Sequence, residues 1–372
     1  MLESLHIEGF RKYKDFTIEG FGRINFILGE NNVGKTSVLE AVYAWACGLN
    51  TLPFIAIPLS RGRYGIQNSF WVMEELLSTV NDRHNLPLRM MFEGVYDGQN
   101  ERFEHIIHPS ALLAELDSTY KNDATKTALR NNDVAKNQSL LSSGFTVQPA
   151  LVADWEIRHN TDDIVTTSLT VPSSSTQAQN PKKLAKFIDL LSYISIAENV
   201  QMYASLKREG LLGEVAKEMR EIFPQIKGFD MIPYADGSQA PVSIENQDGS
   251  YLPMYTYGDG VQKWFYVLGA LAIYKDSIIC IDEVDTGFHP AAQMSFCVSM
   301  VRNAIRNGVQ LFLTTHNIEF VDNLLKAITK LPELEESIRI ITLRDTPDGI
   351  RTRNLSACDA KKARETYNLE LR

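Results

Sequence analysis

The chain has 372 residues, of which 37 are Lys or Arg and 46 are Asp or Glu, giving a formal net charge of −9. Its hydrophobic fraction of 44% and charged fraction of 22% are typical of a folded globular protein and exclude a disordered or fibrous class. The length allows two domains or one large α/β domain with an insertion. The acidic balance argues against a uniformly basic nucleic-acid binder, although it is compatible with a local basic stripe.

Two further features concern the cellular compartment. No apolar run approaches the roughly 20 residues that span a bilayer, and the polar start MLESLHIEGF does not resemble a signal peptide. The four cysteines are far apart and form no CxxC pair, which favours free thiols over a disulfide or zinc framework (Cys47, Cys280, Cys297 and Cys358). We therefore expect a soluble, cytoplasmic protein.

The first part of the chain reads as strand, strand, helix. Apolar and polar residues alternate over residues 2–8, whereas residues 23–28 are more uniformly apolar, as in a central strand. Residues 35–45 then place apolar side chains at helical spacing.

The middle of the chain is less regular. We predict a helix over residues 69–80 and two strands over 88–96 and 102–107, joined by the turn Asp97-Gly98. The polar segment that follows predicts an insertion or arm at 111–180. This divides the chain into an N-terminal lobe (1–110), the insertion, and a C-terminal lobe (181–372).

The C-terminal lobe begins with a helical pattern over residues 181–223, ended by Pro224. Two apolar stripes define it, the first of Leu184, Phe187, Ile188, Leu191 and Ile194, the second of Leu211, Leu212, Val215, Met219 and Ile222. Further on, apolar runs at 278–281 and 310–313 flank a helical stretch at 291–307. Strand, helix, strand in this order predicts a βαβ unit in a parallel sheet.

A phosphate-binding pattern lies between the second strand and the first helix. Residues 29–36 match G-x-x-x-x-G-K-[ST] in full, and the matching residues are Gly29, Glu30, Asn31, Asn32, Val33, Gly34, Lys35 and Thr36, followed by Ser37. Its glycines permit a tight loop of backbone N–H groups at a helix N-terminus, which is a site for anions. Lys35 would reach the β- and γ-phosphates of a nucleotide, and the Thr36 hydroxyl would bind Mg²⁺.

Acidic residues and a histidine follow two later strands. Asp282 and Glu283 end the apolar run SIICI, where one carboxylate can hold Mg²⁺ and the next can act as general base on water. His316 ends the neighbouring strand, where it would contact the γ-phosphate or the attacking water, unless it only caps the strand.

A glycine-rich turn precedes another apolar helix. Gly258, Asp259 and Gly260 stand directly before Trp264, Val267, Leu268 and Leu271, so they form either a second anion site or a plain helix cap.

The motifs GENNVGKT, YGDGVQK, IICIDEVDTGFHP and TTHN, in this order, resemble the ABC-type ATPase heads of the SMC/RecF group, and most of all their OLD-like branch. The opening LHIEGFRKY resembles the start of that group as well, and the similarity covers residues 1–45 and 180–320. The resemblance implies an α/β P-loop NTPase fold, with a mixed sheet like that of an SMC head, flanking helices and a helical or irregular insertion.

The resemblance also assigns roles. Residues 29–36 become the Walker A loop, Asp282 and Glu283 the Walker B pair with the catalytic glutamate, and His316 the switch histidine. Asp285 lies in the D-loop, and Gly258 to Gly260 form the signature motif that a second subunit supplies. Tyr257 stands where many relatives have a serine, and no residue is identified as the Q-loop glutamine.

Several basic and histidine residues have two interpretations. Arg11, with Lys12 and Lys14, would contact nucleotide phosphates or DNA, or would line a solvated strand edge. Lys361, Lys362 and Arg364 are interpreted as a helix face. His105 and His108 do not share a face of their strand, which disfavours a metal site.

The implied function is a switch that uses ATP and Mg²⁺ and closes two heads as a homodimer or higher oligomer. OLD-like ATPases often act in anti-phage systems, where they control an effector. The 56 residues after His316 are too few for the TOPRIM nuclease that many OLD proteins carry, so we expect a separate effector such as a nuclease or toxin, as in PARIS-type systems. The alternatives are a RecF-like ATPase that clamps DNA, which the negative charge disfavours, and an ATP-gated scaffold with little turnover.

Overall fold

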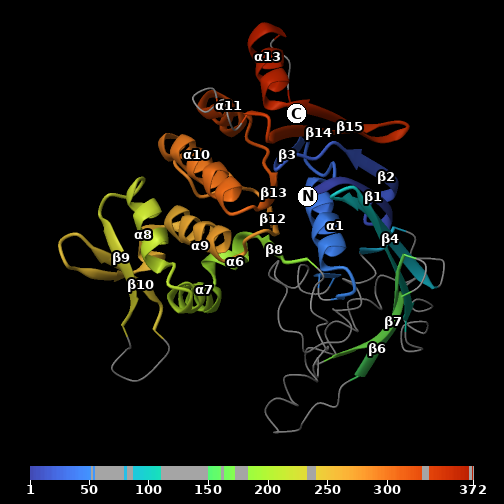
Figure 1. Cartoon of the computed structure of the whole chain (residues 1–372), viewed down its shortest axis with the longest axis horizontal. Helices are drawn as coiled ribbons and strands as arrows, with labels where there is room; N and C mark the ends of the chain where they lie inside the picture. Colours follow the sequence, from blue (N-terminus) through green and yellow to red (C-terminus); the bar gives the residue numbers. More distant parts are fainter. Residues whose placement is uncertain are drawn as a thin grey trace, which may run out of the picture.

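A computed structural model describes residues 1–51, 53–54, 79–81, 87–109, 150–160, 163–171, 183–232, 240–328, 335–367 and 371 (Figure 1). The expected helix at 69–80 lies almost entirely outside these residues, as does the first part of the predicted insertion. No helix in the described part of the chain is long and apolar enough to cross a membrane.

A mixed six-stranded sheet forms the centre of the molecule. Its strands, in spatial order, are β15 (Gly349–Ser356), β14 (Ile338–Thr346), β3 (Ile24–Gly29), β13 (Gln310–Thr314), β12 (Ile278–Ile281) and β8 (Ala185–Ile188). All neighbours pair in parallel except β14 and β15, which form a hairpin. The strands expected at 23–28, 278–281 and 310–313 are confirmed, as is the strand-helix-strand order of the last two.

The central sheet is buried on both faces, which explains its uniformly apolar strands. On β3, Ile24, Phe26 and Leu28 face a core made largely by helices, the helical core. Ile27 faces the opposite core, which surrounds the first helix, the α1 core.

An antiparallel sheet of six strands covers the other side of the α1 core. Its strands, in spatial order, are β2 (Tyr13–Glu19), β1 (Leu2–Phe10), β4 (Leu88–Tyr96), β5 (Gln99–Pro109), β6 (Ala150–His159) and β7 (Asp163–Val171). The helix α1 (Lys35–Cys47) packs between the two sheets (Figure 1). The described part of the predicted insertion is therefore a hairpin, β6 and β7, which continues this sheet.

Helices and a small sheet build the remaining lobe. They are α6 (Leu190–Ile194), α7 (Ile196–Arg208), α8 (Leu212–Arg220), β9 (Ile226–Met231), β10 (Val242–Asn246), β11 (Tyr251–Pro253), the 3₁₀ helix η1 (Met254–Tyr257), α9 (Asp259–Ile273), α10 (Pro290–Arg306), α11 (Ile318–Ile328) and α13 (Ala357–Tyr367). The second predicted stripe is confirmed in α8, whose Val215 and Met219 are buried, and the apolar helix after Gly260 is α9.

The first predicted stripe was wrong at its start. Residues 185–188 form the edge strand β8, paired in parallel with β12, and the helix begins only at Leu190. Phe187 packs in the α1 core and Ile188 in the helical core, so consecutive side chains point to opposite faces as a strand requires. Pairing with β12 thus outweighed a local spacing that also fits a helix.

Candidate functional site

The phosphate-binding loop joins β3 to α1. Gly29 has φ +143°, Asn32 +62° and Gly34 +109°, positive values that favour glycine at the first and last of these positions. A Cβ atom at Gly29 would lie 2.6 Å from the carbonyl oxygen of Leu343, and one at Gly34 would lie 2.5 Å from the Tyr13 hydroxyl. The loop therefore needs both glycines, and it leads into the N-terminus of α1, where free N–H groups and the helix dipole favour an anion.

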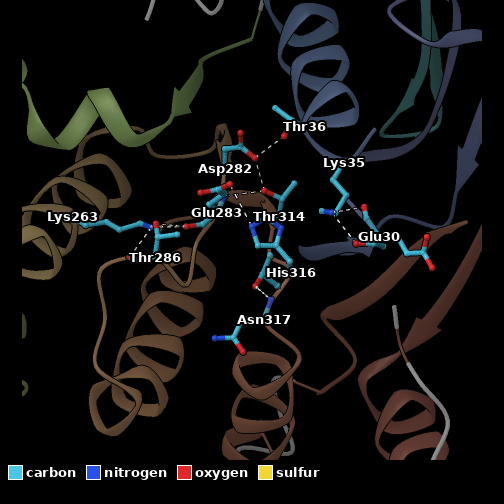
Figure 2. A network of polar contacts seen from close by, with 12 residues as sticks. Glu30, Lys35, Thr36, Lys263, Asp282, Glu283, Thr286, Thr314, His316 and Asn317 are labelled. Carbon is cyan, nitrogen blue, oxygen red and sulfur yellow. Dashed lines mark hydrogen bonds and ion pairs between the residues drawn. The ribbon is translucent and has the colours of Figure 1, made fainter. Parts of the chain in front are cut away.

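Lys35 is the first residue of α1, and its side chain reaches back to this loop. Its Nζ donates to the carbonyl oxygens of Gly29 and Glu30, each at 2.8 Å (Figure 2). Burial lowers the pKa of Lys35, and the carboxylates of Asp282 and Glu283 oppose that shift. The loop thus holds an ammonium group close to the acidic residues at the end of β12.

Thr36 and Asp282 meet across the gap between α1 and β12. The Thr36 hydroxyl donates to Oδ1 of Asp282 at 3.0 Å, and the buried Thr314 hydroxyl donates to the same oxygen at 2.6 Å. A hydroxyl and a carboxylate are the hard oxygen ligands that Mg²⁺ prefers, so the pair fits a magnesium ion bound beside the loop.

Glu283 and His316 face each other at the ends of β12 and β13. His316 Nε2 lies 3.4 Å from Oε1 of Glu283, and their side chains are 43% and 52% exposed. The Glu283 backbone N–H donates to the Thr314 hydroxyl at 2.9 Å, so one threonine holds both members of the acidic pair. Figure 2 shows these side chains converging at the carboxyl ends of neighbouring strands, where ligands of open α/β sheets bind.

A buried lysine contacts the backbone of the segment that carries Asp282 and Glu283. Lys263 on α9 is fully buried, and its Nζ donates to the carbonyl oxygens of Glu283 (2.6 Å) and Thr286 (3.1 Å) and to the Thr286 hydroxyl (2.9 Å). Burial lowers the pKa of Lys263 to about 8, although the carboxylates of Asp285, Glu283 and Asp282 favour its charged form.

Sequence reasoning did not single out Lys263 or Thr314. A signal for Lys263 was present, because it lies on the same stripe of α9 as the buried Tyr266, Val267 and Ala270, and a lysine in such a stripe needs partners. Thr314 is the last residue of a buried strand, and only its position opposite Asp282 distinguishes it from other strand threonines.

The basic residues near the start of the chain and the GDG segment lie outside the cluster formed by Lys35, Asp282 and His316. Arg11 turns its guanidinium to Glu40 on α1, with Nε–Oε2 at 2.8 Å, whereas Lys12 reaches the loop and donates to the Asn32 carbonyl oxygen at 2.9 Å. Gly258 ends η1 and caps the start of α9, so the GDG segment begins that helix as expected.

Residues 24–322 match the AAA_21 family, described as "AAA domain, putative AbiEii toxin, Type IV TA system". The chain belongs to the AAA_21 family.

Three other proteins are similar to the chain in sequence or in fold. The chain is 22% identical to an ATP/GTP phosphatase of Helicobacter pylori over 88% of each protein. It is 38% identical to the DNA replication and repair protein RecF of Clostridioides difficile over 47 residues, 13% of each chain. A Pyrococcus furiosus Smc head domain, solved with an extended coiled coil and bound to the C-terminal domain of ScpA, shares the fold, with a TM-score of 0.50, 12% identity and 99% coverage of both chains.

Proposed function

We propose that the protein is an ATP-hydrolysing molecular switch whose heads pair when ATP binds. The observation that carries this proposal is the convergence of Lys35, Thr36, Asp282, Glu283 and His316 on one place at the ends of β3, β12 and β13. The ATP/GTP phosphatase relative supports hydrolysis as the reaction.

Binding uses the loop and the start of α1. The glycine-rich loop from Gly29 to Gly34 wraps the phosphates with its N–H groups, and Lys35 exchanges its two carbonyl partners for β- and γ-phosphate oxygens. Thr36 and Asp282 would hold Mg²⁺, which would supply positive charge against the charge that develops on the phosphates. Ser37, in the same helical turn, completes the phosphate-binding segment.

Hydrolysis uses the pair at the ends of β12 and β13. Glu283 accepts a proton from the water that attacks the γ-phosphorus, and His316, 3.4 Å away, orients that carboxylate or contacts the γ-phosphate. The leaving group is ADP. Glu283 and His316 would therefore lie beside a γ-phosphate in the ATP form and not in the ADP form.

The exposure of Glu283 and His316 supports the pairing of two heads. Glu283 and His316 are about half exposed in the single chain, whereas phosphoryl transfer benefits from a site that excludes water. A second copy would cover them and bring its own Gly258, Asp259 and Gly260, at a helix N-terminus, to the γ-phosphate. Each composite site then needs both copies, as the resemblance to SMC-type heads implies.

The biological role that we infer is control of a separate effector in bacterial anti-phage defence. The family description, which names a putative toxin of a type IV toxin–antitoxin system, supports a role in defence. The resemblance of the sequence motifs to those of OLD-like ATPases supports the same role. ATP would act as the ligand that shifts the head pair between two states, and the effector would read that state.

A second candidate is a RecF-like DNA clamp, which the short match to RecF favours. It predicts DNA affinity that requires ATP and falls steeply with salt. The defence switch predicts a partner protein that copurifies with the ATPase and no ATP-dependent affinity for DNA.

Sedimentation velocity of three proteins tests the switch. With ATP and Mg²⁺, Glu283→Gln should sediment as a dimer, because it binds ATP without hydrolysing it, whereas with ADP it should return to the nucleotide-free value. Lys35→Ala should keep the nucleotide-free value throughout, and Lys207→Ala, which changes an exposed lysine paired with Tyr203, should behave as wild type. The same sedimentation of Glu283→Gln with ATP, with ADP and without nucleotide would refute ATP-driven pairing.

A further inference from the structure

Lys263 ties the start of α9 to the turn that carries Glu283. We name residues 282–287 the acidic turn. The Lys263 ammonium group donates to three acceptors in it, the Glu283 carbonyl, the Thr286 carbonyl and the Thr286 hydroxyl. The Thr286 hydroxyl in turn donates to the Glu283 carbonyl at 2.9 Å. A fully buried ammonium with all its donors used fixes the acidic turn in one position relative to α9.

A second contact joins the same two segments. A Cβ atom at Gly260 would lie 2.4 Å from the carbonyl oxygen of Gly287, so the backbone of α9's first turn packs directly on the end of the acidic turn. Gly287 itself has φ +83°. Lys263 lies one helical turn after Asp259, so the backbone contact and the ammonium group join the two segments at two neighbouring points.

The Glu283 backbone shows why such support matters. Its φ is +49°, a left-handed conformation that costs a glutamate free energy and persists only where surrounding contacts hold it. Thr314 holds its N–H from β13, and Lys263 holds its carbonyl from α9. The direction of the Glu283 carboxylate toward His316 thus depends on both supports.

We propose that Lys263 is a positioning residue for hydrolysis, which transmits the position of the GDG-bearing start of α9 to Glu283 of the same chain. The inference rests on the proposed function. When a second head engages the GDG segment, any displacement of the first turn of α9 moves the acidic turn with it. Hydrolysis is thereby coupled to pairing, while ATP binding, which uses Lys35 and Thr36 on α1, is not.

Steady-state kinetics combined with equilibrium ATP binding tests this coupling. Lys263→Met keeps the length of the side chain and removes its donors. We expect its kcat to fall on the order of 100-fold, as for a catalytic group displaced by about 1 Å, with an ATP Kd within about twofold of wild type. Lys207→Met, the same substitution at an exposed lysine of α7, should leave both quantities unchanged.

A milder pair of variants keeps the test valid if Lys263→Met does not fold. Thr286→Val removes the hydroxyl that Lys263 contacts and should lower kcat, whereas Thr286→Ser keeps the hydroxyl and should retain it. Lys263→Arg, which keeps the charge and donors, should recover part of the lost kcat. Rates are divided by the number of ATP-binding sites, so that loss of folded protein does not mimic loss of catalysis.

The outcomes separate this inference from the proposed function. If Glu283→Gln abolishes hydrolysis but Lys263→Met and Thr286→Val keep the wild-type kcat, Lys263 has no positioning role. A Kd that rises in parallel with the loss of kcat would also overturn it, since that pattern indicates general damage to the site. If the wild-type protein does not hydrolyse ATP, the proposed function fails and this inference fails with it.

Discussion

At the scale of single residues, a few buried hydroxyl and ammonium groups fix the geometry of the site. Thr314 contacts both Asp282 and the Glu283 backbone, and Lys263 contacts the acidic turn from the opposite side. Neither would touch the nucleotide in the proposed mechanism. Their buried positions nevertheless determine where the two carboxylates lie.

Thr314 should therefore control the response to magnesium. Thr314→Val keeps the shape of the side chain but removes the donor to Asp282 and the acceptor for the Glu283 N–H. We expect the Mg²⁺ concentration for half-maximal ATP turnover to rise about 10-fold or more, because residues that orient a metal ligand affect metal affinity by roughly 10- to 100-fold. A titration of turnover with Mg²⁺ at saturating ATP measures this.

The matched control is Thr342→Val on β14. Thr342 is equally buried, and its replacement by valine removes one hydrogen bond, to the carbonyl oxygen of Leu371, so it controls for an isosteric valine in a buried strand. Its Mg²⁺ response should equal that of wild type. An equal shift in both variants would mean that Thr314 acts only through stability.

His105 should make the protein sensitive to acid. It lies fully buried on β5, the strand between β4 and β6, and accepts a hydrogen bond from the Trp155 indole at 3.2 Å. Burial lowers the pKa of His105 to about 3. The unfolded chain, with a histidine pKa near 6.5, binds the extra proton first. The stability conferred by the neutral ring is thus present above pH ~6.5 and is lost as the pH falls toward the folded-state pKa.

Urea unfolding at several pH values checks this expectation. Between pH ~6.5 and ~4, the free energy of unfolding of wild type should fall more steeply than that of His105→Gln, by up to about 1.4 kcal/mol per pH unit for one proton. Glutamine cannot take up this proton and can still accept from Trp155. Parallel curves for the two proteins would contradict the assignment.

At the scale of elements, the position of α1 on the antiparallel sheet determines where the phosphate-binding loop lies. Trp45 of α1 is fully buried against β4, and a Cβ atom at Gly94 would lie 2.7 Å from its ring and 2.9 Å from Leu2. The same helix begins with Lys35 and Thr36. Packing at its far end therefore supports the site at its start.

Gly94→Ala should destabilise the protein by overpacking this contact. The expected loss is about 1–3 kcal/mol in the free energy of unfolding, measured by urea titration. Gly213→Ala, in the first turn of α8 with nothing within 4 Å of the added Cβ, should not lower stability and serves as the control. A Gly94→Ala protein as stable as the control would show that the sheet yields without cost.

The sequence allowed much of this arrangement to be predicted, because the motif residues follow locally recognisable strands. Residues 29–36 require a preceding strand and a following helix, and Asp282, Glu283 and His316 end apolar runs, so parallel pairing brings them together. The strand β8 was missed because its pairing with β12 joins segments about 90 residues apart in the sequence. The contact of Lys263 with the acidic turn was missed for the same reason, since local patterns do not encode it.

At the scale of the whole molecule, the central sheet connects the two parts of the proposed switch. One face bears α1 with the phosphate-binding loop, and the other bears the helical core with α9 and its GDG segment (Figure 1). Loops at the ends of the sheet strands carry Asp282, Glu283 and His316 between these two faces. In the proposed function, a nucleotide bound on one face of the sheet would thereby affect the surface on the other face.

The central claim is that this site hydrolyses ATP with Glu283 as the base. The most direct measurement is phosphate release from wild type and Glu283→Gln, together with the amount of ATP bound to each. We predict that Glu283→Gln binds ATP as wild type does but releases phosphate at least ~100-fold more slowly, the typical contribution of a general base. Phosphate release at the wild-type rate from Glu283→Gln would contradict the account.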